Sequence, residues 1–108
     1  MQLSELDVNS LIEKSLTLIE QIPQAKGRII EFIPFPQTLN ILGDADKLKQ
    51  IFINLLSNAC EAVENGELIK WRVYYPQTDY VPISITNIGS PISSFNLSTL
   101  PHPFYSTN

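Results

Sequence analysis

The sequence has one cysteine, one histidine and no long apolar run. A single cysteine, Cys60, excludes an intrachain disulfide, and we interpret it as a small buried residue of a protein from a reducing cytoplasm. No apolar stretch approaches the roughly 20 residues of a membrane-spanning helix. The first residues show no signal-peptide pattern. These absences predict a cytoplasmic chain without direct membrane contact.

Positive charge is also scarce. Seven Lys and Arg stand against eleven Asp and Glu, for a net charge of −4, and the basic residues are scattered along the chain. Binding to nucleic acid needs a basic patch, so the composition argues against such a partner. The lone histidine, His102, has no second metal ligand or base beside it, and we interpret it as a loop residue.

The residues that are present describe one globular domain. A length of 108 residues, with 44% hydrophobic and 17% charged residues, is enough for a single core. No repeat or low-complexity segment divides the chain. We therefore assign residues 1–108 to a single domain.

The clearest predicted element is a helix over residues 44–63, DADKLKQIFINLLSNACEAV. Its apolar residues recur every three or four positions, which places them on one side of a helix and predicts a core face. The residues of that face are Leu48, Ile51, Phe52, Leu55, Leu56, Ala59, Ala62 and Val63. The opposite side carries a polar stripe of Gln50, Asn54, Ser57, Asn58 and Glu61.

The polar stripe is unusual because it contains two asparagines one turn apart. Asn is a poor helix former, since its side chain competes for local backbone hydrogen bonds. A solvent-facing stripe would more commonly hold Lys, Glu, Arg or Gln. Capping or chance could explain a single Asn in the middle of a helix, but for the pair Asn54 and Asn58 we favour a polar ligand site.

Around this helix the pattern predicts a second helix and four strands. The other helix spans residues 8–20, with Asp7 or Asn9 as its cap, and the strands span 28–35, 38–42, 68–75 and 81–86. The last two strands are expected to form an antiparallel hairpin. Asp44 or Asp46 would begin the long helix, and the pair 65–66, Asn-Gly, would close it. The order indicates an α+β fold with helices on one face of a sheet.

A second informative place follows the last predicted strand. Asn87 ends that strand and is followed closely by Gly89, so its side chain could point into a cleft while the backbone turns away. A plain turn is the more common explanation of such a pattern. We expect the segment after Gly89 to be poorly anchored, because burial of Phe104 and Tyr105 near the end of the chain is insecure.

Four segments together resemble one family. Residues 46–59, DKLKQIFINLLSNA, resemble the asparagine box of sensor histidine kinases, and residues 83–92, ISITNIGSPI, resemble the first glycine box. Residues 103–107, PFYST, resemble the phenylalanine box, and residues 6–12, LDVNSLI, resemble the helix that opens the catalytic domain. The resemblance covers nearly the whole chain, and the asparagine box is its most specific part.

The resemblance implies the Bergerat-type ATP-binding fold that histidine kinases share with type II topoisomerases, heat-shock chaperones and mismatch-repair ATPases. This fold is a two-layer α/β sandwich, a mixed sheet with helices on one face. Neither the helix with the phosphoacceptor histidine nor the glycine-rich ATP lid is in the 108 residues. We expect the chain to be the larger part of a catalytic domain, truncated before its lid, and to be cytoplasmic or the cytoplasmic part of a membrane-attached sensor.

The resemblance also implies ligands and partners. ATP and Mg²⁺ are the expected cofactors, and the phosphoryl group would pass to a histidine on the dimerisation domain of the same kinase, then indirectly to a response regulator. Nucleotide contacts are implied for Gln50, Asn54, Asn58, Asn87, Gly89 and Thr107, with the Asn58 oxygen as the direct Mg²⁺ ligand. No catalytic residue lies within the chain.

Three positions depart from relatives in this superfamily. Asn87 stands where the glycine box has an Asp that accepts from the adenine amino group, and its amide oxygen can still accept. Because a charged acceptor is stronger, we expect Asn87→Asp to strengthen ADP binding. Pro91 replaces a glycine and fixes the turn. Gln50 stands where hydrolysing relatives have a Glu, and an amide cannot act as a general base, so phosphoryl transfer is favoured over hydrolysis.

Two alternatives to the kinase domain stay open. The first is a degenerate module with weak or no ATP binding that serves in docking or dimerisation, which Asn87 and Pro91 favour. The second is a relative that phosphorylates serine on an anti-anti-sigma partner or hydrolyses ATP. Glu61 departs from the basic residue that many kinases place nearby, and we assign it no role.

Overall fold

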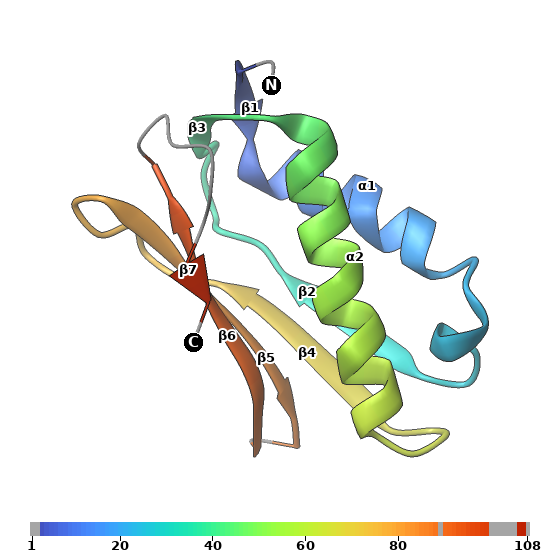
Figure 1. Cartoon of the computed structure of the whole chain (residues 1–108). Coiled ribbons are helices and arrows are strands. Elements are labelled where there is room, and N and C mark those ends of the chain that lie inside the picture. The colour runs from blue at the N-terminus through green and yellow to red at the C-terminus, as the bar shows by residue number, and fades with distance from the viewer. Residues whose placement is uncertain (1–2, 89, 100–105, 108) are drawn as a thin grey trace.

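The chain folds into two layers, with two helices packed on one face of a sheet (Figure 1). The computed structural model describes residues 3–88, 90–99 and 106–107. The helices are α1 (Val8–Ile19) and α2 (Ala45–Ala62), with a 3₁₀ turn, η1, at Pro23–Ala25. The strands are β1 (Ser4–Asp7), β2 (Ile29–Ile33), β3 (Asn40–Gly43), β4 (Leu68–Val73), β5 (Tyr80–Asn87), β6 (Ser90–Ser98) and β7 (Ser106–Thr107).

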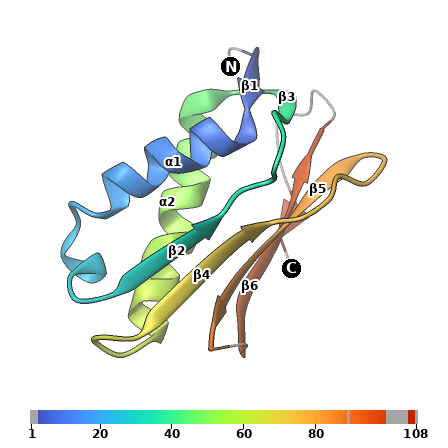
Figure 2. The same cartoon turned by 180° about the vertical axis from the view of Figure 1, so that it is seen from behind.

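The main sheet is mixed, with the strand order β2-β4-β5-β6-β7. Strand β2 runs parallel to β4, because the chain passes through α2 between them, and the other neighbours are antiparallel. Strands β1 and β3 form a separate antiparallel pair at the end where α2 begins (Figures 1 and 2). The predicted α+β class, the helices on one face and the antiparallel hairpin of β4 and β5 are confirmed.

Both helices begin at an aspartate. The Asp7 carboxylate accepts from the Asn9 amide at 3.3 Å, and the Asp44 carboxylate accepts from the Asp46 and Lys47 amides at 3.1 and 3.2 Å. These bonds satisfy N–H groups that the first turn of a helix leaves without partners. Of the two caps that the sequence allowed for each helix, the structure selects the first in both cases.

The core lies between the helices and the sheet. The Phe52 ring of α2 packs edge-on against Trp71 of β4 at 5.3 Å and against Phe95 of β6 at 6.2 Å between centroids. All three side chains are buried, as is Cys60, which was predicted to be a buried residue. These contacts set the orientation of α2, because the face that carries Phe52 must point at the sheet.

The prediction made for the segment that forms strand β6 is wrong. The segment after Gly89 was expected to be poorly anchored, but Ser90–Ser98 pairs with β5 along most of its length, and Phe95 and Leu97 are fully buried. The sequence pattern was weak because Pro91 and the pair Ser93–Ser94 interrupt the alternation, so that only Phe95 and Leu97 mark the buried face. Strand β1 was also missed, since it is short and pairs only with β3.

A second prediction, on how α2 ends, is also wrong. Asn65 and Gly66 were expected to close the helix, but it ends at Ala62, and Val63 is already extended with φ −118° and ψ 159°. Gly66, with φ +89°, lies in a separate turn in which Glu67 N–H donates to the Glu64 carbonyl at 3.1 Å. The carbonyls at the end of α2 are therefore not satisfied by a glycine cap of the usual kind.

Candidate functional site

The polar stripe of α2 faces away from the core, as predicted. Gln50, Asn54, Asn58 and Glu61 are exposed, and Ser57 is half-buried. The opposite face of the helix carries fully buried side chains such as Leu48, Phe52 and Leu56. The sequence therefore distinguished correctly between the two faces of this helix, except that Ala62, which was assigned to the core face, is exposed in the last turn.

The two asparagines of the stripe have free amide groups. Neither the Asn54 nor the Asn58 side chain makes a hydrogen bond to any other residue that the structure describes. An amide side chain offers an acceptor oxygen and two N–H donors without a net charge. One turn apart on the same exposed face, the pair can bind a polar ligand through both kinds of group.

Asn87, the third asparagine, is already engaged. Its side-chain nitrogen donates to the Leu68 carbonyl at the start of β4, at 2.7 Å, and the residue is half-buried. This bond fixes the orientation of the amide, so that the oxygen is left as a free acceptor. No sequence pattern marks this bond, because Leu68 is 19 residues away along the chain.

The turn after Asn87 is strained at Ile88. This residue has φ +49°, in the left-handed region, and its side chain is 79% exposed. A β-branched residue in this region is uncommon and costs about 1–2 kcal/mol. The strain accompanies a change of direction between β5 and β6 directly after the amide of Asn87.

The end of α2 and the end of β5 lie at the same end of the molecule; Asn58 is near that end of the helix, whereas Asn54 is at its middle. Figures 1 and 2 show the last turns of α2, the end of β5 and the start of β4 gathered there, opposite the end that holds β1 and β3. The predicted site residues on α2 and β5 are thus carried by neighbouring elements. Glu61 lies on the last turn of α2, exposed, and has no assigned role.

Two of the predicted site residues cannot be assessed in full. Gly89 lies outside the described residues, as do His102 and most of the phenylalanine-box segment, residues 103–107. Thr107 belongs to β7, whose backbone pairs with Phe95 of β6. The nucleotide contacts of Gly89 and Thr107 stay predictions.

In the described part of the chain, no cluster of three or more His, Cys, Asp or Glu side chains could hold a metal ion. Cys60 is buried, and burial raises the pKa of its thiol, against the opposing effect of the Arg28 charge. A buried neutral thiol is a poor ligand and a poor nucleophile.

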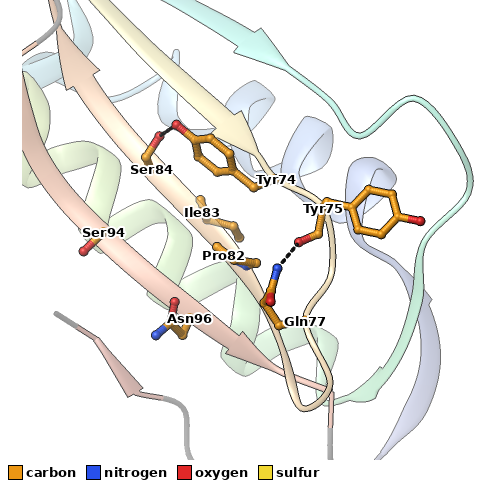
Figure 3. A pocket seen from close by; sticks show the side chains of 8 residues that line it. All are labelled: Tyr74, Tyr75, Gln77, Pro82, Ile83, Ser84, Ser94 and Asn96. Atoms are coloured by element: carbon orange, nitrogen blue, oxygen red, sulfur yellow. Dashed lines mark hydrogen bonds between the residues drawn. The ribbon is translucent and has the colours of Figure 1, made fainter.

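A hollow on the other side of the sheet contains none of the predicted site residues. It has a volume of about 500 Å³ and lies against the outer face of β5 and β6, away from the helices (Figure 3). Tyr74 forms part of its wall, held by a 2.9 Å hydrogen bond between its hydroxyl and that of Ser84. The lining residues are Tyr74, Tyr75, Gln77, Pro82, Ile83, Ser84, Ser94 and Asn96.

Sequence comparison finds similar proteins among sensor kinases, although no family model matches the chain. The sensor histidine kinase ZraS of Klebsiella oxytoca is 27% identical over 107 residues, which cover 99% of this chain and 23% of ZraS. Sporulation kinase B of Bacillus subtilis is 32% identical over 100 residues, covering 93% of this chain and 23% of that kinase. The chain therefore spans about a quarter of the length of these curated relatives.

Solved structures agree with the sequence matches. The catalytic domain of histidine kinase ThkA superposes with a TM-score of 0.70 at 29% identity, covering 85% of this chain and 62% of that domain. The chain is related to the catalytic domains of sensor histidine kinases. Its fold is that of the histidine-kinase catalytic domain, and the sequence resemblance to this family is confirmed.

One residue of this end of the catalytic domain was not singled out from the sequence. Arg28 precedes β2 and donates to two carbonyls at the end of α2, Cys60 and Val63, at 3.0 and 3.1 Å. A lone arginine beside a glycine gives no sequence signal, because its partners are backbone groups more than thirty residues away.

Proposed function

We propose that the chain binds ATP with Mg²⁺ as part of a sensor kinase and supplies the phosphoryl group to a histidine on a separate dimerisation domain. The observation that carries this is the pair of free amides, Asn54 and Asn58, on the exposed face of α2. A helix face made only for solvent has no need of two poor helix formers one turn apart.

The donor set suits Mg²⁺ bound together with a nucleotide. Mg²⁺ prefers oxygen ligands and keeps several waters, so one protein oxygen beside the phosphates is sufficient, and Asn58 would supply it. Asn54 would hydrogen-bond a phosphate or a bound water. Neither side chain carries a negative charge that would repel the triphosphate. Mg²⁺ bound here would neutralise part of the phosphate charge.

Asn87 would read the adenine base. Its oxygen is the free end of the amide, since the nitrogen donates to the Leu68 carbonyl at 2.7 Å. A fixed acceptor suits the exocyclic amino group of adenine and would meet the carbonyl of guanine without a hydrogen bond. This preference supports adenine as the base.

The reaction class is phosphoryl transfer to a protein side chain. Gln50, one turn before Asn54, is exposed and neutral, and an amide cannot remove a proton from water. The receiving histidine would belong to another domain. ThkA has been crystallised with the response regulator TrrA, which supports a response regulator as the downstream partner of a kinase that contains this chain.

The location of the domain follows from the same proposal. None of the described helices is long and apolar enough to cross a membrane. Since ATP is supplied in the cytoplasm, the catalytic domain would work there.

The substitution Asn58→Ala tests the proposal. We expect it to abolish Mg²⁺-dependent ADP binding and to leave the free energy of unfolding equal or higher by a few tenths of a kcal/mol, since Ala is the better helix former. Binding would be followed by NMR titration with ADP, with and without Mg²⁺, and stability by thermal melting.

Lys47→Ala provides the control on the same helix. Lys47 is exposed in the first turn of α2, far along the helix from Asn58. Its replacement should leave Mg²⁺-ADP binding unchanged. Unchanged binding by Asn58→Ala, or a melting point far below that of the parent chain, would return Asn58 to a structural role and remove the main support for this function.

A further inference from the structure

The last turn of α2 depends on a side chain from outside the helix. The helix has no basic residue in its last turn, and Val63 leaves it in an extended conformation. The final carbonyls of a helix lack partners within it. Arg28 provides donors for two of these carbonyls. Its Nε donates to the Cys60 carbonyl at 3.0 Å, and its Nη2 donates to the Val63 carbonyl at 3.1 Å.

The residues on either side of Arg28 hold the loop that follows α2. The Gly27 carbonyl accepts from the Gly66 amide at 2.7 Å, and the Ile29 amide donates to the Glu67 carbonyl at 3.1 Å. Gly27 has φ +81°, and a Cβ at this position would overlap the Asn65 side chain. The positive φ favours glycine here, and any other residue would also have to displace the Asn65 side chain.

The same connection reaches Asn87. Ile29 is paired with Leu68 in the parallel register of β2 and β4. The Leu68 carbonyl accepts from the Asn87 side chain at 2.7 Å. Residues 27–29 are therefore bonded to the last turn of α2 on one side and, through the start of β4, to Asn87 on the other. Figures 1 and 2 both show the start of β2 beside these two elements.

We propose that Arg28 is a positioning residue that fixes the last turn of α2, with Asn58, relative to Asn87. Asn58 lies two residues before Cys60, whose carbonyl Arg28 binds, so loss of this contact would free the turn that carries Asn58. The inference rests on the proposed function, because it assigns the two asparagines to opposite ends of one nucleotide.

The planar guanidinium is suited to this position. Its N–H groups point in fixed directions, so one side chain can bind two carbonyls of a helix end while Nη1 donates to the Lys26 carbonyl at 3.1 Å. A lysine at position 28 would carry the same charge on a single nitrogen and could not reproduce all three bonds. The conservative variant therefore separates the geometry of Arg28 from its charge.

Two ligands distinguish positioning from a general loss of structure. Adenosine would engage only Asn87, whereas Mg²⁺-ADP would engage both asparagines. We expect Arg28→Gln to weaken Mg²⁺-ADP binding about tenfold and to leave adenosine binding within about twofold. Arg28→Lys should give a smaller loss for Mg²⁺-ADP and none for adenosine. Both ligands would be titrated by NMR, with spectra confirming that each variant is folded at the temperature used.

Arg72→Gln is the matched control. Arg72 lies on the outer face of β4, with its guanidinium 4.8 Å from the centre of the Tyr74 ring, and has no contact with α2 in the described structure. It should change neither affinity. A fourth variant, Asn58→Ala combined with Arg28→Gln, should bind ADP without Mg²⁺ as Asn58→Ala alone does, because Arg28 then has nothing left to position.

The outcomes separate this inference from the proposed function. If the parent chain binds neither ligand, the proposed function fails and the inference fails with it. If the parent chain binds Mg²⁺-ADP and Arg28→Gln binds it equally well, only the positioning role is overturned. Equal losses for adenosine and Mg²⁺-ADP, or unfolding of both Arg28 variants, would also overturn it and leave Arg28 as a general structural cap.

Discussion

At the scale of single residues, the amides of this domain fall into two groups. Asn54 and Asn58 are exposed and have no partners in the described structure, although each costs helix α2 up to about 0.7 kcal/mol relative to alanine. Asn9 and Asn87 are bound instead. The Asn9 side chain donates to the Phe35 carbonyl at 2.7 Å and accepts from the Phe35 amide at 3.1 Å. Bound amides hold the backbone, and the free pair is available to a ligand.

The hydrogen bond of Asn87 changes what is expected of Asn87→Asp. The sequence alone suggested that a carboxylate would bind ADP more strongly. In the structure, an ionised Asp would place an oxygen against the Leu68 carbonyl, where Asn87 now donates. We expect the free energy of unfolding at pH 7 to fall by about 1–3 kcal/mol, because a half-buried acceptor loses its donor.

Urea denaturation of Asn87→Asp and of the parent chain at pH 7 and pH 4 would test this. A protonated carboxyl can donate to the carbonyl, so the difference between the two proteins should shrink at the lower pH. Asn87→Ala, which removes the donor without adding charge, should show no such change with pH. A variant as stable as the parent at pH 7 would mean that the bond to Leu68 contributes nothing.

At the scale of elements, α2 is held at its two ends by different means. Its start is capped by the neighbouring Asp44 carboxylate, which accepts from amides of the first turn. Its end is capped by Arg28, which is distant in the sequence. Between them the helix is fixed to the sheet by the Phe52 ring, which packs on Trp71 and Phe95. These three attachments determine the direction in which the polar stripe of α2 faces.

Strand β6 is the element whose importance is easiest to measure. Phe95 is 1% exposed and packs edge-on against Phe52, so Phe95→Ala should lower the free energy of unfolding by about 3–5 kcal/mol. Asn96 is the neighbouring residue on the opposite face of the same strand, and Asn96→Ala should cost less than about 0.5 kcal/mol.

Chemical denaturation of the two variants decides whether β6 is part of the cooperative fold. If Phe95→Ala were as mild as Asn96→Ala, the strand would contribute little to the core, and the expectation of a poorly anchored segment after Gly89 would be restored.

At the scale of the whole molecule, the proposed nucleotide site would have an acceptor for adenine, Asn87, but little that could surround the phosphates. The 108 residues contain four glycines, at positions 27, 43, 66 and 89, so no glycine-rich loop is available to present successive N–H groups to a triphosphate. Binding of phosphate would depend on Mg²⁺ and the two free asparagines of α2.

We therefore expect the 108-residue chain to fold and to bind ATP weakly, with a Kd of about 1 mM or higher, and to transfer no phosphate by itself. Isothermal calorimetry or NMR titration would measure the affinity, and thermal melting would establish that the chain is folded. Micromolar binding would show that other residues of this chain hold the phosphates.

The sequence by itself determined the local features. The periods of α1 and α2, their aspartate caps and the hairpin of β4 and β5 depend on residues that are neighbours in the chain. For the same reason the polar face of α2, with Asn54 and Asn58, could be identified before the structure. The asparagine-box pattern then pointed to the family, which the relatives and ThkA confirm.

Only the tertiary structure decided how the site is held together. Arg28 binds carbonyls 32 and 35 residues away, and Asn87 binds one 19 residues away. The partners are backbone groups, which every residue has, so no pattern of side chains could mark them in advance. Strand β6 was missed for a related reason: Pro91 and Ser93 interrupt its local alternation, and its position is determined by pairing with β5 and by the packing of Phe95 on Phe52 of α2.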